Sequence, residues 1–164
     1  MPDRVHLRVV VPKNRNLSGW LYVELDGKPV TRMRVLARGS RGPGDTQFLE
    51  NGNTPTGVYD GSVFQSTQNF PVESYGPWGA IRLKPLSGNA ITAEKLFGRS
   101  GLLIHGGSLG GPGYWRGNGA LRATYGCLRV SNSDMHTLLQ LLVEDDSMGM
   151  SRATLPAVTV TIQD

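Results

Sequence analysis

The sequence lacks the features of disulfide-stapled and membrane-spanning proteins. A single cysteine, Cys127, occurs among 164 residues, so no disulfide can form within the chain. No apolar window approaches the ~18 residues needed to span a membrane. The first residues, "MPDRVHLRVVVPKN", also lack the apolar core of ~7 to 15 residues found in secretory signals. We therefore expect no membrane insertion and find no signal peptide.

Charged residues are few, at 18% of the chain, and their balance is basic. Seventeen basic residues, thirteen of them arginine, face thirteen acidic ones, which gives a formal charge of +4. This charge fits an acidic partner, such as nucleic acid, an anionic cell-wall polymer or a carboxylate-rich peptide. The arginines are scattered along the sequence, and the interleaved aromatic and basic residues of single-stranded nucleic-acid binders are not evident. Nucleic acid is therefore not an expected partner.

Glycine and proline are abundant, with 22 and 10 residues, and they separate short strand-like runs. A chain of this length can bury about two thirds of its unfolded surface, so residues 1–164 are predicted to form one domain. Runs with partial two-residue alternation predict strands over residues 5–11, 19–25, 29–37, 58–65, 79–86, 101–105 and 157–162. We predict a mainly β fold in which two small mixed sheets form a sandwich.

One segment near the C-terminus is predicted to be an amphipathic helix. Ser131 to Ser133 supply an N-cap, and Asp134 favours the positive end of the helix dipole. Apolar residues then recur at helical spacing, namely Met135, Leu138, Leu139 and Leu142. This helix is predicted to begin near Ser133 and to cover one edge of the sheets, while residues 91–98 predict a turn or a second short helix.

Cys127 and His105 are the candidate reactive pair, on either side of a glycine-rich stretch. A free thiol has a pKa near ~8.5, so nucleophilic work at neutral pH calls for a neighbouring base or oriented amides. His105 ends an apolar run, so a rigid strand would present it, with a backbone carbonyl near Gly106 or Gly107 accepting from its second nitrogen. From the residues alone, a lone cysteine beside Leu128 equally fits a buried, inert side chain.

The spacing of several motifs resembles the YkuD-type L,D-transpeptidases. "IHGG" followed by "TYGCLRVSN" is similar to the active-site motif of that family, in which a histidine-glycine pair precedes Ser/Thr-His-Gly-Cys and a capped helix. "GWLYVELDGKPVTRMRVLARG" is similar to the family's first hairpin, "NTPTGVYDG" to its Pro-Thr-Gly strand and "PAVTVTI" to its closing strand. The resemblance covers nearly the whole chain and implies a YkuD-like fold.

The resemblance also implies catalytic roles. Cys127 would be the nucleophile and His105, beside Gly106, the general base. The amides of Tyr125, Gly126 and Cys127 would surround the oxyanion. The family usually has a second histidine where this sequence has Tyr125, so the contribution of that imidazole is absent or altered.

Substrate contacts are expected from two segments. Arg129 falls where the family places a substrate-contacting arginine, and Thr124 precedes the Tyr-Gly-Cys turn. The stretch from His105 to Cys127 is longer than usual, and we expect residues 106–123 to form an enlarged loop over the cleft. Tyr114 and Trp115 at its centre would either close over a peptide stem or anchor the loop to the sheet.

The implied reaction is acyl transfer on peptidoglycan tetrapeptide stems through a Cys127 thioester, without a cofactor or metal. Its outcome would be 3-3 cross-linking, D-amino acid exchange or L,D-carboxypeptidase hydrolysis. We expect a monomer that acts in the periplasm or cell wall, either after removal of a leader or through a specialised secretion route. The alternatives are a secreted antibacterial effector with the same chemistry and a catalytically silent wall-binding homologue.

Overall fold

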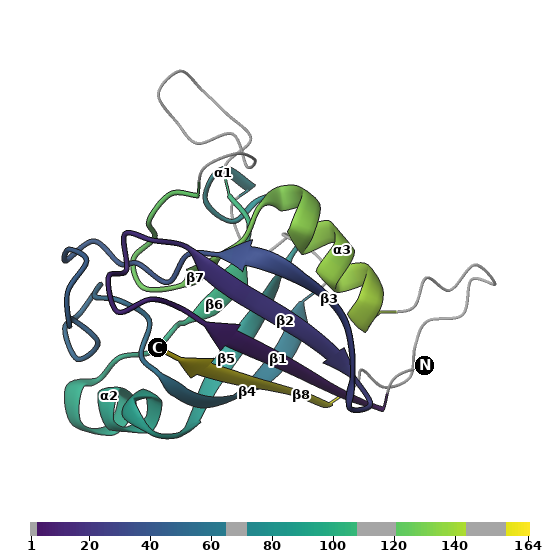
Figure 1. The fold of residues 1–164 in the computed structure, drawn as a ribbon. Coiled ribbons are helices and arrows are strands. Elements are labelled where there is room, and N and C mark those ends of the chain that lie inside the picture. Colours follow the sequence, from purple (N-terminus) through teal and green to yellow (C-terminus); the bar gives the residue numbers. More distant parts are fainter. Residues whose placement is uncertain (1–2, 65–71, 108–120, 144–156) are drawn as a thin grey trace.

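The strands form one mixed sheet that curves into a near-barrel (Figure 1). The computed structural model describes residues 3–64, 72–107, 121–143 and 157–164. Within these ranges the strands are β1 (Arg4–Val10), β2 (Gly19–Leu25), β3 (Lys28–Val35), β4 (Gly57–Phe64), β5 (Ala80–Ser87), β6 (Leu103–His105), β7 (Leu128–Arg129) and β8 (Ala157–Gln163). Their order across the sheet is β3-β2-β1-β8-β4-β5-β6-β7.

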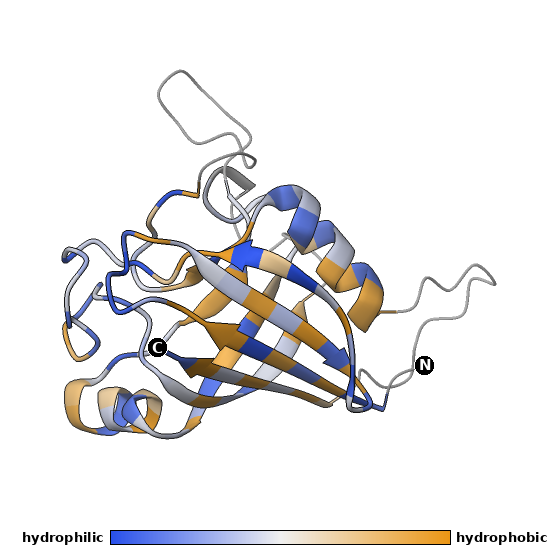
Figure 2. Cartoon of the chain, viewed as in Figure 1, coloured by the Kyte–Doolittle hydropathy of each residue, from blue (hydrophilic) through white to orange (hydrophobic). Residues whose placement is uncertain are grey.

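The centre of the sheet joins segments from the two ends of the chain. β1 and β8 pair in parallel, with Val5 opposite Val158 and Val9 opposite Ile162. Side chains alternate between inside and outside along both strands, as the two-residue period requires (Figure 2). The inward residues form the apolar core, while polar and charged residues occupy the outer face. The alternation read from the sequence is thereby confirmed.

A pair of hydrogen bonds links the two edges of the sheet. The chain just beyond β3 meets β7, where the Leu36 amide donates to the Arg129 carbonyl and the Arg129 amide donates to the Leu36 carbonyl, both at 2.9 Å. Bulges in the β2–β3 and β4–β5 pairs increase the local bending. The mainly β class is confirmed. The strands belong to one continuous sheet, so curvature, and not a break into two sheets, encloses the core.

Three helices lie within the described ranges, at α1 (Val72–Tyr75), α2 (Asn89–Phe97) and α3 (Asn132–Leu142). α3 is the predicted amphipathic helix: Ser131 caps it by accepting from the Asp134 amide at 3.1 Å. Met135, Leu138 and Leu142 of α3 are fully buried in the same core as the strand residues. α1 is not anticipated by the sequence analysis. None of these helices combines the length and apolar character needed to cross a membrane.

Candidate active site

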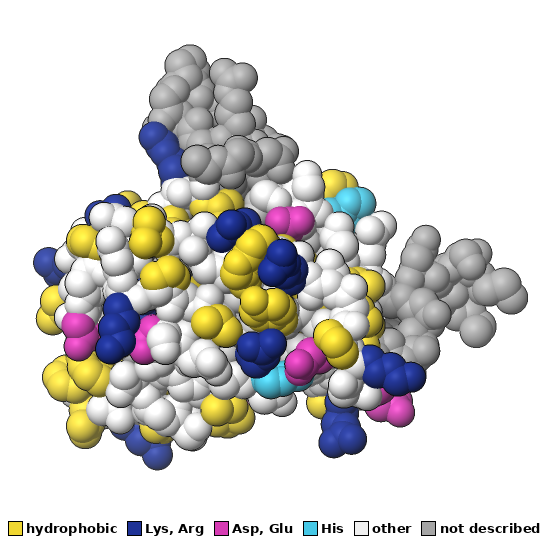
Figure 3. Space-filling view, viewed as in Figure 1, with side chains coloured by type: hydrophobic (Ala, Val, Ile, Leu, Met, Phe, Trp, Pro, Cys, Tyr) yellow, Lys and Arg dark blue, Asp and Glu magenta, His cyan; other side chains and the backbone are white. Residues whose placement is uncertain are grey.

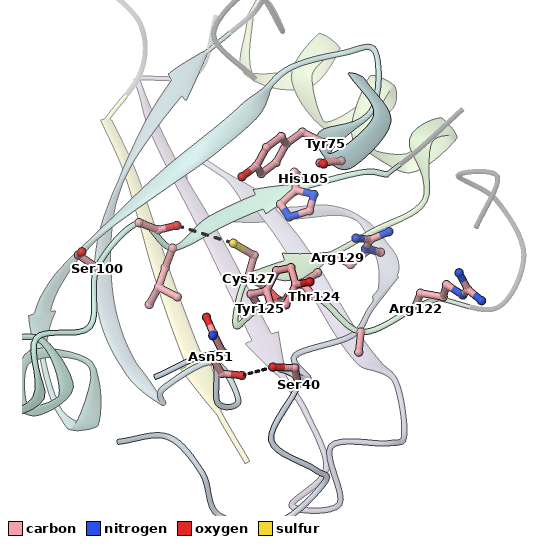
Figure 4. A pocket seen from close by; sticks show the side chains of 14 residues that line it. Ser40, Asn51, Tyr75, Ser100, His105, Arg122, Thr124, Tyr125, Cys127 and Arg129 are labelled. Carbon is pink, nitrogen blue, oxygen red and sulfur yellow. Dashed lines mark hydrogen bonds between the residues drawn. The ribbon is translucent and has the colours of Figure 1, made fainter. Parts of the chain in front are cut away.

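Two paired strands bring His105 and Cys127 to one side of the sheet. β6 and β7 run parallel, with Ile104 opposite Leu128 and His105 opposite Arg129. Because side chains alternate along a strand, Ile104 and Leu128 point into the core and their neighbours point away from it. Cys127, immediately before β7, therefore shares a face with His105 and Arg129, and all three surround one cleft (Figure 4).

The cleft has a volume of about 660 Å³. His105 and Cys127 lie in its wall, together with the arginines Arg122 and Arg129. None of the described residues that line it is an aspartate or glutamate. The electrostatic character of the cleft is therefore positive, which suits a ligand that carries carboxylates.

His105 is held as a neutral imidazole. Its side chain is 3% exposed, and its Nδ1 lies 2.5 Å from the Gly106 carbonyl oxygen. A carbonyl only accepts hydrogen bonds, so Nδ1 carries the proton and Nε2 is the basic nitrogen. Tyr75 from α1 packs edge-on against the ring, with centroids 4.8 Å apart. Burial, reinforced by the charge of Arg129 and opposed by the Gly106 hydrogen bond, lowers the pKa of His105 to about 4.

Cys127 is half-buried and its thiol has two backbone neighbours. Its Sγ accepts from the Leu103 amide at 3.3 Å and lies 3.8 Å from the Gly101 carbonyl. Burial raises the pKa of the Cys127 thiol, whereas the Leu103 amide and the positive charges of Arg129 and Arg99 oppose this rise. The resting pair is therefore a neutral thiol beside a neutral imidazole, not a preformed thiolate–imidazolium pair.

The turn before Cys127 is fixed by the hydroxyl of Thr124. This oxygen accepts from the Gly126 amide at 3.0 Å and donates to the Cys127 carbonyl at 2.9 Å. The Gly126 amide is thus already engaged, which corrects the expectation that it points at an oxyanion. Within the described part of the chain, the Tyr125 and Cys127 amides have no acceptor. Thr124 lines the cleft, but its hydroxyl is committed to the turn and not to a ligand.

A buried arginine supports this turn from below, and the sequence analysis missed it. Arg99 is 6% exposed and donates to the carbonyls of Gln47, Gly52 and Asn53 at 2.8, 3.0 and 2.6 Å. The Thr54 hydroxyl donates to the Gly126 carbonyl at 2.7 Å, which ties the same loop to the turn. No local sequence signal predicts the role of Arg99, because its partners are backbone groups about fifty positions away.

Asn132 fixes the backbone that follows His105, and it is also missing from the predicted site. Its Oδ1 accepts from the Gly107 amide at 2.9 Å, and its Nδ2 donates to the Gly107 carbonyl at 3.1 Å. A side chain on Gly106 would collide with Asn132. The asparagine at the end of "TYGCLRVSN" is the signal that could have drawn attention to this contact.

The sequence of this chain matches one protein family over most of its length. The model of the YkuD family, described as the L,D-transpeptidase catalytic domain, matches residues 8–160. The chain belongs to this family. A search among curated proteins found no match.

Solved structures share the fold at low sequence identity. Bd1075 of Bdellovibrio bacteriovorus is 19% identical with a TM-score of 0.57, over 96% of this chain and 48% of that one. L,D-transpeptidase 1 of Mycobacterium tuberculosis is 12% identical with a TM-score of 0.49, over 98% of this chain and 62% of that one. The chain therefore spans about half to three fifths of the length of these two proteins.

The remaining predicted residues of this YkuD domain have different positions. Arg129 lines the cleft, where burial lowers the pKa of its guanidinium and the nearby Cys127 opposes that shift. Tyr125, which stands in place of the family histidine, is 76% exposed at the rim. Tyr114 and Trp115 lie outside the described residues, as does most of the loop expected over the cleft. Within the described ranges, no group of three or more histidine, cysteine or acidic side chains could hold a metal ion.

Proposed function

We propose that this YkuD domain is a cysteine-dependent L,D-transpeptidase acting on peptidoglycan tetrapeptide stems. The observation that carries the proposal is the pairing of β6 and β7, which gives Cys127 and His105 a common cleft. The Gly106 hydrogen bond supports His105 as the base, because it leaves Nε2 unprotonated. The positive cleft supports a carboxylate-bearing donor.

In the proposed acylation step, Nε2 of His105 takes the thiol proton as Sγ of Cys127 attacks the carbonyl of the third stem residue. A carbon–sulfur bond forms and the peptide bond to D-alanine breaks, while His105 returns the proton to the departing amine. The amides of Tyr125 and Cys127 are the donors available for the oxyanion, and one such donor contributes about 3 to 4 kcal/mol. The product is a thioester.

The neutral resting pair determines when the thiolate forms. Both pKa shifts favour the uncharged thiol and imidazole, so proton transfer accompanies attack and does not precede it. A carboxylate or carbonyl entering the cleft therefore meets no resting thiolate. Arg129, close enough to oppose the rise in the thiol pKa, stabilises the developing negative charge and binds a donor carboxylate.

Deacylation transfers the acyl group to whichever nucleophile enters next. An amine of a second stem gives a 3-3 cross-link, a free D-amino acid gives exchange, and water gives carboxypeptidase hydrolysis. His105 takes the proton of that nucleophile and returns it to the Cys127 sulfur. We propose that these reactions take place at the peptidoglycan layer, in the periplasm or cell wall.

Covalent trapping with a carbapenem tests the proposed nucleophile. An activated cysteine beside oxyanion donors opens the strained lactam, so intact mass should show one adduct per chain, located on Cys127 by peptide mapping. The Cys127→Ala variant should show none. If the wild-type chain stays unmodified, or if the variant is modified equally, the assignment is wrong and a silent wall-binding homologue becomes the better interpretation.

A further inference from the structure

The outer face of β1, β2 and β3 gathers arginines that are separate in the sequence. Arg34 and Arg32 lie over the ring of Trp20, with guanidinium carbons 3.9 and 4.1 Å from its centroid. Arg8 lies 4.4 Å from the centroid of Tyr22 on the neighbouring pair of strands. We call these five residues the arginine–aromatic face, and Figure 3 shows blue and yellow side chains together in this part of the surface.

Strand register explains this gathering. Trp20 is opposite Arg34, and Tyr22 has Arg32 on one side and Arg8 on the other. Outward positions recur every second residue, so a partial alternation of arginine and aromatic residues becomes a continuous patch once the strands pair. The scattered arginines of the sequence are therefore clustered in space.

The charge of this face is largely uncompensated. Its one carboxylate, Glu24, is bound by His6 at 2.9 Å and lies 4.0 Å from Arg8. Within the described ranges, no carboxylate lies within salt-bridge distance of the exposed residues Arg32 and Arg34. Stacking on Trp20 restricts these guanidinium groups, so binding an anion orders little that is not already ordered.

The arginine–aromatic face is connected to the cleft. β3 continues from Arg34 to Leu36, about 7 Å further along the strand. Leu36 exchanges two backbone hydrogen bonds with Arg129, which lines the cleft. A long polymer in the cleft can therefore reach guanidinium groups on the outer sheet as well.

We propose that the arginine–aromatic face binds the peptidoglycan polymer itself, through the carboxylates of stems that are not being processed. The proposal rests on the proposed function for its choice of polymer. Planar guanidinium groups bind carboxylates through two parallel hydrogen bonds, and an extended polymer offers one carboxylate group after another. Such contacts hold the domain on its substrate between turnovers and raise the local concentration of stems at Cys127.

Co-sedimentation with purified sacculi tests this inference. We expect R32Q/R34Q to weaken binding by about tenfold or more at low salt, and rising NaCl to weaken the wild-type chain towards the variant. The control variant K28Q/K95Q removes the same charge from exposed lysines that stack on no aromatic ring, and it should bind within about twofold of wild type. Equal binding by R32Q/R34Q and the control would overturn the proposal.

A second variant pair tests the geometry of recognition. R32K/R34K keeps both charges but loses the planar two-pronged donor, so we expect about threefold weaker binding than wild type. It also serves if R32Q/R34Q proves unstable in thermal unfolding. Unchanged binding by R32K/R34K would contradict two-pronged recognition of carboxylates.

Two further arms identify the ligand and separate this inference from the proposed function. Sacculi whose carboxylates have been amidated should lose the difference between wild type and R32Q/R34Q. A variant that loses duplex DNA binding but sediments normally would identify a nucleic-acid surface and overturn the proposal. Turnover of a soluble disaccharide-tetrapeptide should be unchanged in R32Q/R34Q. An unreactive Cys127 would refute the proposed chemistry, whereas the sedimentation result requires no chemistry.

Discussion

The guanidinium of Arg99 lies against Gly126, the residue that precedes the candidate nucleophile. A Cβ atom at position 126 would collide with Arg99 Nη2, and the φ of +121° at Gly126 is one that other residues rarely adopt. Arg99 in turn binds three carbonyls of the 47–53 loop. The position of Cys127 therefore depends on a glycine above and a buried cation below.

Gly126→Ala should destabilise the fold by roughly 2 to 4 kcal/mol, because it combines backbone strain with a collision. Urea unfolding measures the loss. Gly98→Ala is the matched control, since Gly98 also has a positive φ, +70°, but has no atom within 4 Å of the added Cβ. It should cost about 1 kcal/mol. Equal losses in the two variants would show that contact with Arg99 is unimportant.

Removing the charge of Arg99 should make Cys127 a weaker acid. Arg99 opposes the rise in the thiol pKa, so Arg99→Met should shift the pH midpoint of iodoacetamide alkylation upward. Arg99→Lys keeps the charge and should leave the midpoint near the wild-type value, even where stability falls. An unchanged midpoint in Arg99→Met would contradict an electrostatic role.

Much of this architecture is predictable from local sequence patterns. Alternation locates the strands, and the Ser131 cap with the apolar spacing of Met135 and Leu138 locates α3. The apolar run before His105 and the glycines after it correctly indicate a strand end whose carbonyl can accept from the imidazole. Each of these features depends on neighbours only a few positions away in the chain.

The features that the sequence did not reveal depend on distant contacts. The bridge between Leu36 and Arg129 joins the sheet edges across more than ninety positions, so two sheets and one curved sheet give the same strand pattern. Arg99 binds backbone carbonyls, which every residue possesses. Arg32 and Arg34 become part of a charged face only through the register of β2 and β3.

Thr124 should act through the turn and not through the substrate. Thr124→Val removes the acceptor of the Gly126 amide and should slow carbapenem acylation by about 10- to 100-fold. Thr124→Ser keeps the hydroxyl and should stay within about threefold of wild type. If Thr124→Val raises only KM for a soluble stem and leaves carbapenem acylation intact, the residue contacts substrate instead.

Stability should fall with acid because His105 is buried and neutral. Its pKa is about 4 in the folded chain against 6.5 when exposed, so the unfolded state takes up a proton first as pH falls. The contribution is fully present above pH 6.5 and is lost towards pH 4, on the order of 3 kcal/mol. Urea unfolding at several pH values should show this slope, and His105→Gln should flatten it. An equal slope in the variant would assign the effect to other groups.

Arg129 should matter for substrate as well as for charge. Arg129→Lys keeps the positive charge beside Cys127 but loses the two-pronged donor, so iodoacetamide alkylation should be nearly unchanged while turnover of a disaccharide-tetrapeptide falls about tenfold or more. Arg129→Ala should impair both reactions. Equal loss of alkylation and turnover in Arg129→Lys would mean that the arginine maintains the site and does not bind the donor.

The acyl-enzyme itself is the most direct test of a Cys127 thioester mechanism. Intact mass should be measured after rapid acid quenching of the chain mixed with a disaccharide-tetrapeptide. The account predicts a protein that is heavier by the mass of the donor less that of D-alanine, mapped to Cys127, labile to hydroxylamine and absent from Cys127→Ala. Free D-alanine released at the wild-type rate by Cys127→Ala, or turnover with no thioester at any quench time, would contradict it.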